Sequence, residues 1–235
     1  MQGRIDMQSA STRQPPCPAI SGTVYGVVLN DRASLNSIGA ALEDAPYKGA
    51  PKAPVMYIKP RNTLTGSGAV VQLPAGADAV EIGATVGILI GRPAARLHAA
   101  DAMSVIAGFA LVADLSLPHA SYYRPAIREK CFDASCPVGN VAAADLAGDL
   151  RELVLQTTID DRLVAQWPLA HLVRDVPQLL ADITEFMSLD TGDMVLVGVP
   201  YLAPQAVAGS RVQVGANRPE LGTLTFSIAA EGGKA

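Results

Sequence analysis

The run EIGATVGILIGR (81–92) constrains the fold more than any other stretch, because no charged side chain lies between Glu81 and Arg92. Successive side chains of a strand point to opposite faces, so a strand formed by this run is largely apolar on both faces. Such strands lie in the interior of a sheet, covered on each side. Gly83 and Thr85 share one face with Glu81. The run therefore predicts a central strand with one face of small residues.

The remaining apolar runs, separated by Gly and Pro, predict mainly strands. We expect strands at SGTVYGVVLN (21–30), PVMYIKP (54–60), ALVADLSL (110–117), MVLVGVP (194–200), GSRVQVGA (209–216) and GTLTFSI (222–228). RELVLQTTID (151–160) and RLVAQW (162–167) predict a hairpin around Asp160 and Asp161. Helical patterns occur at 32–44, 98–109 and 172–187, the last with Pro177 in its first turn. These elements predict one strand-rich α+β domain over residues 21–230, after a flexible tail at 1–20.

Composition narrows the class of protein. Of the 235 residues, 49% are hydrophobic and 17% are charged, which is typical of a chain with a substantial core. The 18 Lys and Arg against 22 Asp and Glu argue against a nucleic-acid coat or a polybasic membrane anchor. No apolar stretch approaches the ~20 residues of a transmembrane helix, and the N-terminal stretch has no signal-peptide core. We expect a cytoplasmic protein without nucleic-acid or membrane partners.

Asp114 is the most informative polar residue, because it lies inside the apolar run ALVADLSL. An isolated buried carboxylate is very costly, so Asp114 must be paired or coordinated if it is buried. One interpretation is a structural salt bridge or a carboxylate that caps backbone N–H groups. The other is a metal ligand or an acid–base residue. The strand pattern alone favours the structural interpretation.

A set of cations lies just beyond the ends of two predicted strands: Lys59, Arg61, Arg124, Arg128 and Lys130. Guanidinium and ammonium groups recognise carboxylates, so together they could form a pocket for a small polycarboxylate. A solvated loop face is the alternative interpretation. His119 is the one histidine expected near such a pocket. Cys131 and Cys136 raise the option of thiol chemistry, but their spacing is not that of a redox pair and buried cysteines are commonly inert.

Several long stretches carry a resemblance to a known family. They are YGVVLNDRASL, PYKGAPKAPVMYIKPRNTLTGSG, EIGATVGILIGR, IAGFALVADLSLPHASYYRPAIREKCFDASCPVG and FMSLDTGDMVLVGVP. Together they span about residues 22–215 and resemble the fumarylacetoacetate hydrolase family. The resemblance implies the strand-rich mixed β-roll of that family's C-terminal domain.

The resemblance also implies an activity. Its substrate class is small unsaturated 2-hydroxy and 2-oxo polycarboxylates. The implied reactions are isomerisation of 2-hydroxyhepta-2,4-diene-1,7-dioate and decarboxylation of 5-oxopent-3-ene-1,2,5-tricarboxylate, in 4-hydroxyphenylacetate catabolism. Some members fuse two related halves, so we expect a homodimer or a hetero-oligomer with a sister subunit.

The family's site residues are only partly present. Active members carry a Glu-x-Glu pair and a downstream Asp that hold Mg²⁺ or Mn²⁺. The glutamate positions fall on Gly83 and Thr85, and the Asp is matched by Asp114. Glu81 lies one step of about 6.6 Å away, out of bonding reach of a metal placed for residues 83 and 85. With Asp114 as the only ligand, we expect the metal to bind weakly or not at all.

Of the other site residues of the family, some are present in this sequence and one is replaced. The family's Lys falls on Lys130, with Asp133 in the same Phe-Asp setting, whereas its first-strand His falls on Ser34. The resemblance thus implies Lys130 and Asp114 as catalytic residues, and substrate binding is expected from Lys59, Arg61, Arg124 and Asp133. Two hypotheses follow. Either the chain is an isomerase/decarboxylase acting through Lys130 and Asp114, or it is a metal-free, non-catalytic subunit that completes an oligomer with a Glu-x-Glu sister chain.

Overall fold

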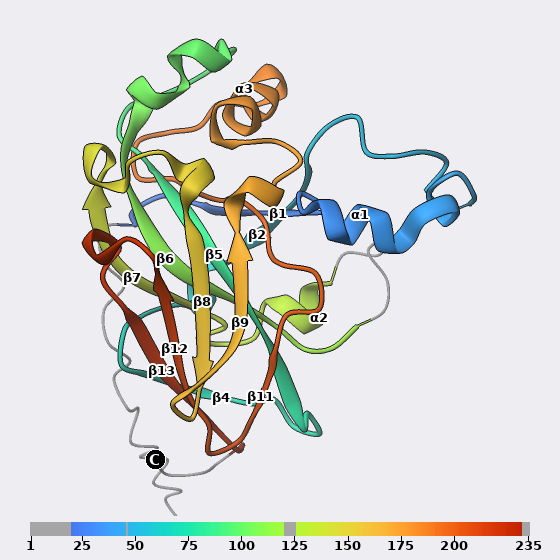
Figure 1. The fold of residues 1–235 in the computed structure, drawn as a ribbon, viewed down its shortest axis with the longest axis vertical. Helices are drawn as coiled ribbons and strands as arrows, with labels where there is room; N and C mark the ends of the chain where they lie inside the picture. Colours follow the sequence, from blue (N-terminus) through green and yellow to red (C-terminus); the bar gives the residue numbers. More distant parts are fainter. Residues whose placement is uncertain (1–19, 46, 120–125, 232–235) are drawn as a thin grey trace, which may run out of the picture.

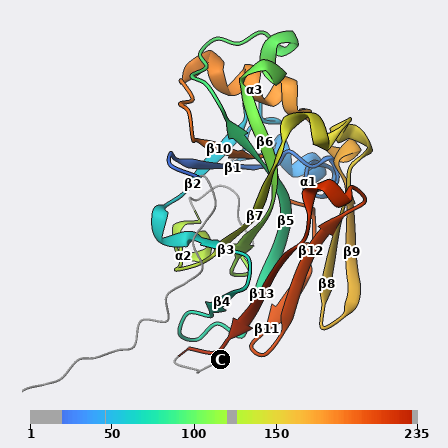
Figure 2. The same cartoon turned by 90° about the vertical axis from the view of Figure 1, so that its left-hand side faces the viewer.

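Two β-sheets face each other in the computed structural model, which describes residues 20–45, 47–119 and 126–231 (Figures 1 and 2). The larger sheet has eight strands and the smaller has five. In order, the larger sheet consists of β2 (Val55–Lys59), β1 (Val24–Val28), β10 (Met194–Leu196), β5 (Ala79–Ile90), β6 (Ile106–Ser116), β7 (Cys136–Ala143) and β3 (Leu64–Gly66), with β11 (Gln205–Val207) also paired to β5. The smaller sheet runs β4 (Ala69–Gln72), β13 (Leu224–Ala229), β12 (Arg211–Ala216), β8 (Val154–Ile159) and β9 (Arg162–Pro168).

The prediction of a central strand is confirmed. β5 lies between β6 on one side and β10 and β11 on the other, antiparallel to all three. All its residues from Ile82 to Ile90 are buried. A strand with neighbours on both edges and cover on both faces needs the continuous apolar run that the sequence provides.

The hairpin expected around Asp160 and Asp161 is also present. β8 and β9 pair antiparallel on either side of these two residues, and both aspartates adopt positive φ angles, of 50° and 63°. Asp tolerates this left-handed conformation better than most residues, and two such residues in succession are what a tight hairpin turn requires.

Helices are short and lie at the edges of the sheets. They comprise α1 (Arg32–Ile38), α2 (Ile127–Lys130), α3 (Val176–Phe186) and 3₁₀ turns at Gly39–Leu42, Arg61–Thr63, Ala99–Val105, Ala144–Ala147, Leu150–Glu152, Leu169–His171 and Pro219–Leu221. The helix expected at 172–187 begins only at Val176, because Asp175 caps it by accepting from Gln178 N. The helix expected at 98–109 is a 3₁₀ turn, and its last part instead belongs to β6.

The two faces of β6 serve different layers. Leu111 packs in the main core with Leu155 and Val212 of the smaller sheet, whereas Val112 lies in a second apolar cluster. Asp114 follows Val112 by two residues and therefore lies on the face turned away from the smaller sheet. The candidate site is built on this outer face.

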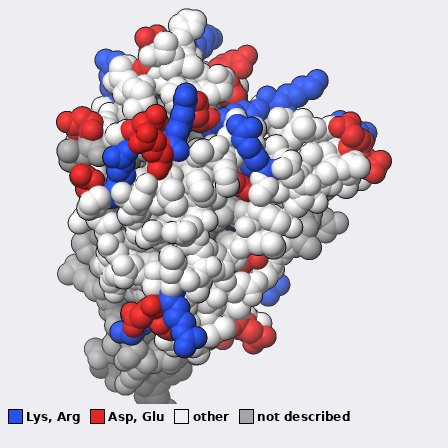
Figure 3. Space-filling model, in the orientation of Figure 1, with Lys and Arg blue, Asp and Glu red and all other residues white. Residues whose placement is uncertain are grey.

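The charges seen in Figure 3 are of mixed sign, with Lys and Arg beside Asp and Glu near the upper and lower ends of that view. No helix in the described part of the chain is long and apolar enough to cross a membrane.

Candidate active site

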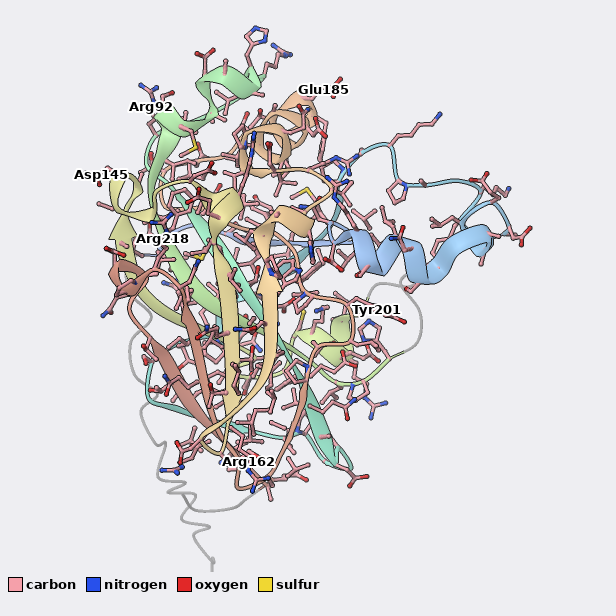
Figure 4. All side chains as sticks on the ribbon, in the orientation of Figure 1. Arg92, Asp145, Arg162, Glu185, Tyr201 and Arg218 are labelled. Atoms are coloured by element: carbon pink, nitrogen blue, oxygen red, sulfur yellow. The ribbon has the colours of Figure 1, made fainter. Side chains whose placement is uncertain are left out.

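A cavity of about 400 Å³ opens where β5 and β6 meet on this outer face. Charged and polar side chains from four parts of the chain reach it: the α1 region, β5, β6 with the residues that follow it, and α2. Apolar residues of the segment after β10 complete the wall. Its lining comprises Val28, Ser37, Ile38, Tyr47, Glu81, Gly83, Asp114, Ser116, His119, Lys130, Val199, Pro200, Tyr201, Leu202 and Ala203. In Figure 4 the labelled Tyr201 lies near α2, which ends at Lys130.

Asp114 forms the base of the cavity. It is opposite Gly83 in the antiparallel pairing of β5 and β6, so both residues face the same side of the sheet. The Asp114 side chain is fully buried, with 0% of its surface exposed. Asp114 therefore has the features of both interpretations. It is paired in salt bridges, as the structural interpretation requires, and it lines a cavity, as the functional one requires.

Two ammonium groups hold the Asp114 carboxylate. Lys59 Nζ lies 3.0 Å from Oδ1 and Lys130 Nζ lies 2.8 Å from Oδ2. The Lys130 contact is also a hydrogen bond, whereas, among the described residues, Oδ1 accepts no hydrogen bond and is held by the ion pair with Lys59 alone. Both pairs are shielded from water, where charges attract most strongly. The structure thus brings together three of the residues singled out in the sequence, as a buried Lys–Asp–Lys cluster.

Lys59 and Lys130 occupy different positions around the carboxylate. The Lys59 side chain has no exposed surface, and Nζ also lies within hydrogen-bond distance of Lys130 O (2.5 Å), Ser135 Oγ (3.2 Å) and Leu115 O (3.3 Å). Lys59 does not line the cavity. Lys130 does, and 8% of its side chain is exposed. Of the described Lys and Arg side chains, Lys130 is therefore the one that a molecule in the cavity can contact, while Lys59 supports the carboxylate from the side away from the cavity.

Tyr57 completes the cluster, and the sequence analysis missed it. Its hydroxyl donates a short hydrogen bond to Asp114 Oδ2, and its ring lies 4.8 Å from Lys130 Nζ, within cation–π range. Burial first, and then the charge of Asp114, raise the pKa of Tyr57 well above its usual value, so the phenol remains a donor. Strand alternation offered a signal, because Tyr57 and Lys59 share one face of β2.

The charge state of Asp114 follows from these partners. Burial by itself raises the pKa of the carboxyl. The Lys130 and Lys59 ammonium groups and the hydrogen bonds from Lys130 and Tyr57 outweigh that effect and lower the pKa to about 2. Asp114 is consequently an anion that fixes the Lys130 ammonium in place, and a poor proton acceptor.

A second polar group lines the cavity around Glu81. Glu81 pairs with Ser116 across β5 and β6, and Ser116 Oγ lies 3.3 Å from His119 Nδ1. His119 was the histidine expected near a pocket, and the structure places it there. Burial raises the pKa of Glu81, while the charges of His119 and Lys130 lower it less strongly.

Other expected site residues lie elsewhere. Arg61 and Asp133 are exposed and do not line this cavity, although Asp133 accepts a hydrogen bond of 2.7 Å from Asn62. Arg124 falls outside the described residues. Ser34, at the family's histidine position, is buried and its backbone N–H donates to the cap residue Asp31. The substrate-binding roles of Arg61, Arg124 and Asp133 stay predictions.

The two described cysteines give thiol chemistry no support. Cys136 is buried in the second apolar cluster. Cys131 is half-buried, and burial is the main cause that raises its pKa, which disfavours the thiolate that reacts. Neither thiol lines the cavity.

The fold and the match to a family profile define the class of protein. A mixed two-sheet architecture with few helices matches the strand-rich roll expected from the sequence. Residues 23–229 match the sequence profile described as fumarylacetoacetate (FAA) hydrolase C-terminal. The chain belongs to the fumarylacetoacetate hydrolase family.

Individual relatives refine the comparison. The chain is 40% identical over 195 residues to the 4-hydroxyphenylacetate degradation bifunctional isomerase/decarboxylase of Escherichia coli, a match that covers 83% of this chain and 44% of that protein. It thus spans less than half the length of that curated relative. It is also similar to the solved 2-hydroxyhepta-2,4-diene-1,7-dioate isomerase of Mycobacterium marinum, with 26% identity, a TM-score of 0.74, and 92% and 78% of the two chains covered.

A further solved structure bears on the metal. The maleylpyruvate hydrolase of Sphingobium sp. SYK-6 in complex with manganese(II) and pyruvate shares the fold, with 22% identity, a TM-score of 0.73, and 92% and 73% of the two chains covered. That structure raises the question of whether the residues of this chain fit such a metal.

The donor set here does not fit a divalent cation. Such ions need several oxygen ligands, but each Asp114 oxygen already contacts an ammonium group. A Cβ at Gly83 would lie 2.5 Å from the Asp114 carbonyl oxygen and 2.8 Å from Val199 Cγ1, so no side chain has room there. Thr85 offers only a buried hydroxyl. Within the described ranges, no three His, Cys, Asp or Glu side chains come together as a metal site.

Proposed function

We propose that this chain acts on small unsaturated 2-hydroxy and 2-oxo polycarboxylates of 4-hydroxyphenylacetate catabolism. Its reactions would be the isomerisation of 2-hydroxyhepta-2,4-diene-1,7-dioate and the decarboxylation of 5-oxopent-3-ene-1,2,5-tricarboxylate. The names of the relatives support both reactions. The observation that carries the proposal is the Lys130 ammonium, held 2.8 Å from Asp114 in the cavity wall.

Lys130 supplies the charge that both reactions need. Each one builds negative charge, as an enolate, on the oxygen next to a carboxylate, which is the C2 oxygen of the diene and the C5 oxygen of the tricarboxylate. A fixed ammonium whose side chain is only 8% exposed stabilises such charge more strongly than it would in bulk water. Asp114, Tyr57 and Lys59 keep that ammonium oriented without taking its proton, because the pKa of Asp114 is about 2.

The isomerisation requires only the movement of a proton and of double bonds. The enol O–H bond at C2 breaks, the C2=C3 and C4=C5 double bonds become C2=O and C3=C4, and a C–H bond forms at C5. No oxidant or reductant enters. A cation beside the C2 oxygen and a proton donor near C5 are therefore the two kinds of group that the isomerisation needs. In the decarboxylation, the bond between C2 and its carboxylate breaks and CO₂ leaves. The electron pair of that bond stays on the substrate and forms the same kind of dienolate.

The other predicted site residues and the predicted oligomer are also part of this proposal. Lys59 acts by supporting Asp114, and the substrate-binding roles of Arg61, Arg124 and Asp133 are kept as proposals. A homodimer or a hetero-oligomer in the cytoplasm is the proposed setting. The non-catalytic alternative is less favoured, because the relatives carry the names of enzymes.

Lys130→Met tests the proposal. The purified chain should convert 2-hydroxyhepta-2,4-diene-1,7-dioate, followed by loss of the diene absorbance, and Lys130→Met should lower kcat at least a hundredfold. Lys52→Met is the matched control, since Lys52 is exposed and lies outside the cavity. Equal rates for Lys130→Met and the wild-type chain would refute the role of Lys130. No turnover alone, but turnover after addition of a Glu-x-Glu sister chain, would favour the subunit alternative.

A further inference from the structure

We propose that Glu81 is a catalytic residue, the acid that delivers the proton to the substrate carbon during isomerisation. This inference rests on the proposed function and names a residue that neither the family's metal-ligand pattern nor the sequence analysis assigns to the reaction.

The position of Glu81 in the sheet is the first argument. Glu81 lies in β5, paired with Ser116 of β6 on one side and with Gln205 of β11 on the other. It shares its face with Gly83, which is opposite Asp114. Glu81 is half-buried, while Asp114 is fully buried, so Glu81 stands nearer the solvent along the same cavity wall.

The separation between the two ends of the cavity is the second argument. One two-residue step of a strand, about 6.6 Å, divides Glu81 from the Gly83–Asp114 pair. The isomerisation has two separate demands, which are charge stabilisation at the C2 oxygen and protonation at C5. A cation and an acid that lie apart on one wall can serve these two positions of an extended substrate at once.

The surroundings of Glu81 raise the pKa of its carboxyl group. Among the described residues, the titratable groups that line the cavity with it are Tyr47, Asp114, His119, Lys130 and Tyr201. Burial raises the pKa of Glu81, and the opposing charges of His119 and Lys130 are smaller influences. A carboxyl that keeps its proton to higher pH than an exposed glutamate is better suited to act as a general acid.

His119 lines the same cavity as Glu81 and offers a way for the acid to regain its proton. His119 Nδ1 lies 3.1 Å from Leu117 O. Ser116 Oγ lies 3.3 Å from the same nitrogen, so these contacts hold the ring at the cavity wall, and an imidazole can both accept and give protons. In the balanced step, Glu81 gives its proton to C5 and becomes a carboxylate. The proton lost from the enol oxygen, relayed through His119 or water, restores the acid.

The test compares Glu81→Gln with the wild-type chain on 2-hydroxyhepta-2,4-diene-1,7-dioate. We expect kcat to fall at least a hundredfold while KM changes less than about threefold, because the amide keeps the shape but has no proton to give. Glu81→Asp should retain part of the activity. Glu185→Gln is the matched control, because Glu185 is exposed on α3, far from Tyr201 in Figure 4. Thermal unfolding of all variants checks their folding.

The outcomes separate this inference from the proposed function. An active wild-type chain whose Glu81→Gln variant keeps its kcat overturns the role of Glu81 alone. A rise in KM at constant kcat also overturns it, since Glu81 would then only bind. A wild-type chain that shows no turnover overturns the proposed function and this inference with it.

Discussion

Gly26 and Tyr57 lie directly opposite each other across β1 and β2, and the Tyr57 ring fills the space that a side chain at residue 26 would need. A Cβ at Gly26 would lie 2.0 Å from Tyr57 Cζ. The absence of a side chain in β1 thus allows the Tyr57 ring to take its place, from which the hydroxyl reaches Asp114. The arrangement of side chains around Asp114 therefore depends on a glycine that lies outside the cavity.

Gly26→Ala should displace the Tyr57 ring and weaken its hydrogen bond to Asp114. Overpacking of a buried position costs about 1–3 kcal/mol, so the free energy of unfolding should fall by that amount. Turnover should fall as well, because Lys130 loses part of its support. Urea denaturation and steady-state kinetics on the same preparation measure both effects.

Gly215→Ala is the control for this substitution. Gly215 is also a strand glycine, in β12, but a Cβ there meets nothing within 4 Å. Its unfolding free energy should change by less than about 0.5 kcal/mol. If Gly26→Ala proves equally harmless, Tyr57 does not depend on the glycine.

The ionisation of Asp114 makes stability depend on acid pH. Its pKa is lowered from 3.8 to about 2 in the folded chain, so the unfolded chain binds the proton more readily. The resulting stabilisation, about 2 kcal/mol, is complete above pH 4 and is lost as the pH falls towards 2. A carbon-13 NMR titration of the Asp114 carboxyl should give a midpoint near 2. A midpoint near 4 would mean that the two ammonium groups do not act on it as described.

Thr85→Val should stabilise the fold. Thr85 is fully buried and its Oγ1 has no hydrogen-bond partner. Folding therefore removes the hydroxyl from water without a hydrogen bond to replace the one it loses. Replacing it by a methyl group should raise the free energy of unfolding by about 1 kcal/mol and leave kcat unchanged. A loss of activity in this variant would show that the hydroxyl at this family ligand position still serves the reaction.

Much of the fold follows from local sequence patterns. The apolar run at 81–92, the Asp160–Asp161 turn and the Asp175 cap each specify their element through short-range physics. The strands β3, β4, β7 and β11 were not predicted. β3, β4 and β11 have only three or four residues, which carry too little periodicity, and β7 contains Pro137 and Gly139, which interrupt a strand pattern. Their pairing depends on partners far away in the chain, as when Ala69 pairs with Phe226.

The site was predictable only in part. The position of Asp114 in an apolar strand required a partner, but the pattern did not say which cation would supply it. Lys59 and Lys130 converge on it from β2 and α2 through tertiary packing. Tyr57 and Glu81 went unrecognised as site residues, since a tyrosine in a strand and a glutamate at the start of one are common on solvated surfaces. Their relation appears only in the folded chain, where Glu81 lines the cavity and Tyr57 contacts Asp114 at its base.

The most direct test of the account concerns the role of the ammonium cluster in place of a metal. Turnover of 2-hydroxyhepta-2,4-diene-1,7-dioate by the purified chain would be measured after exhaustive chelation and again with added Mn²⁺, alongside calorimetric titration with Mn²⁺. The account predicts equal rates in both conditions and no saturable Mn²⁺ binding at the cavity. Turnover that disappears on chelation and returns with Mn²⁺ would contradict it, since a metal would then occupy a site that Lys59, Lys130 and Val199 fill in this structure.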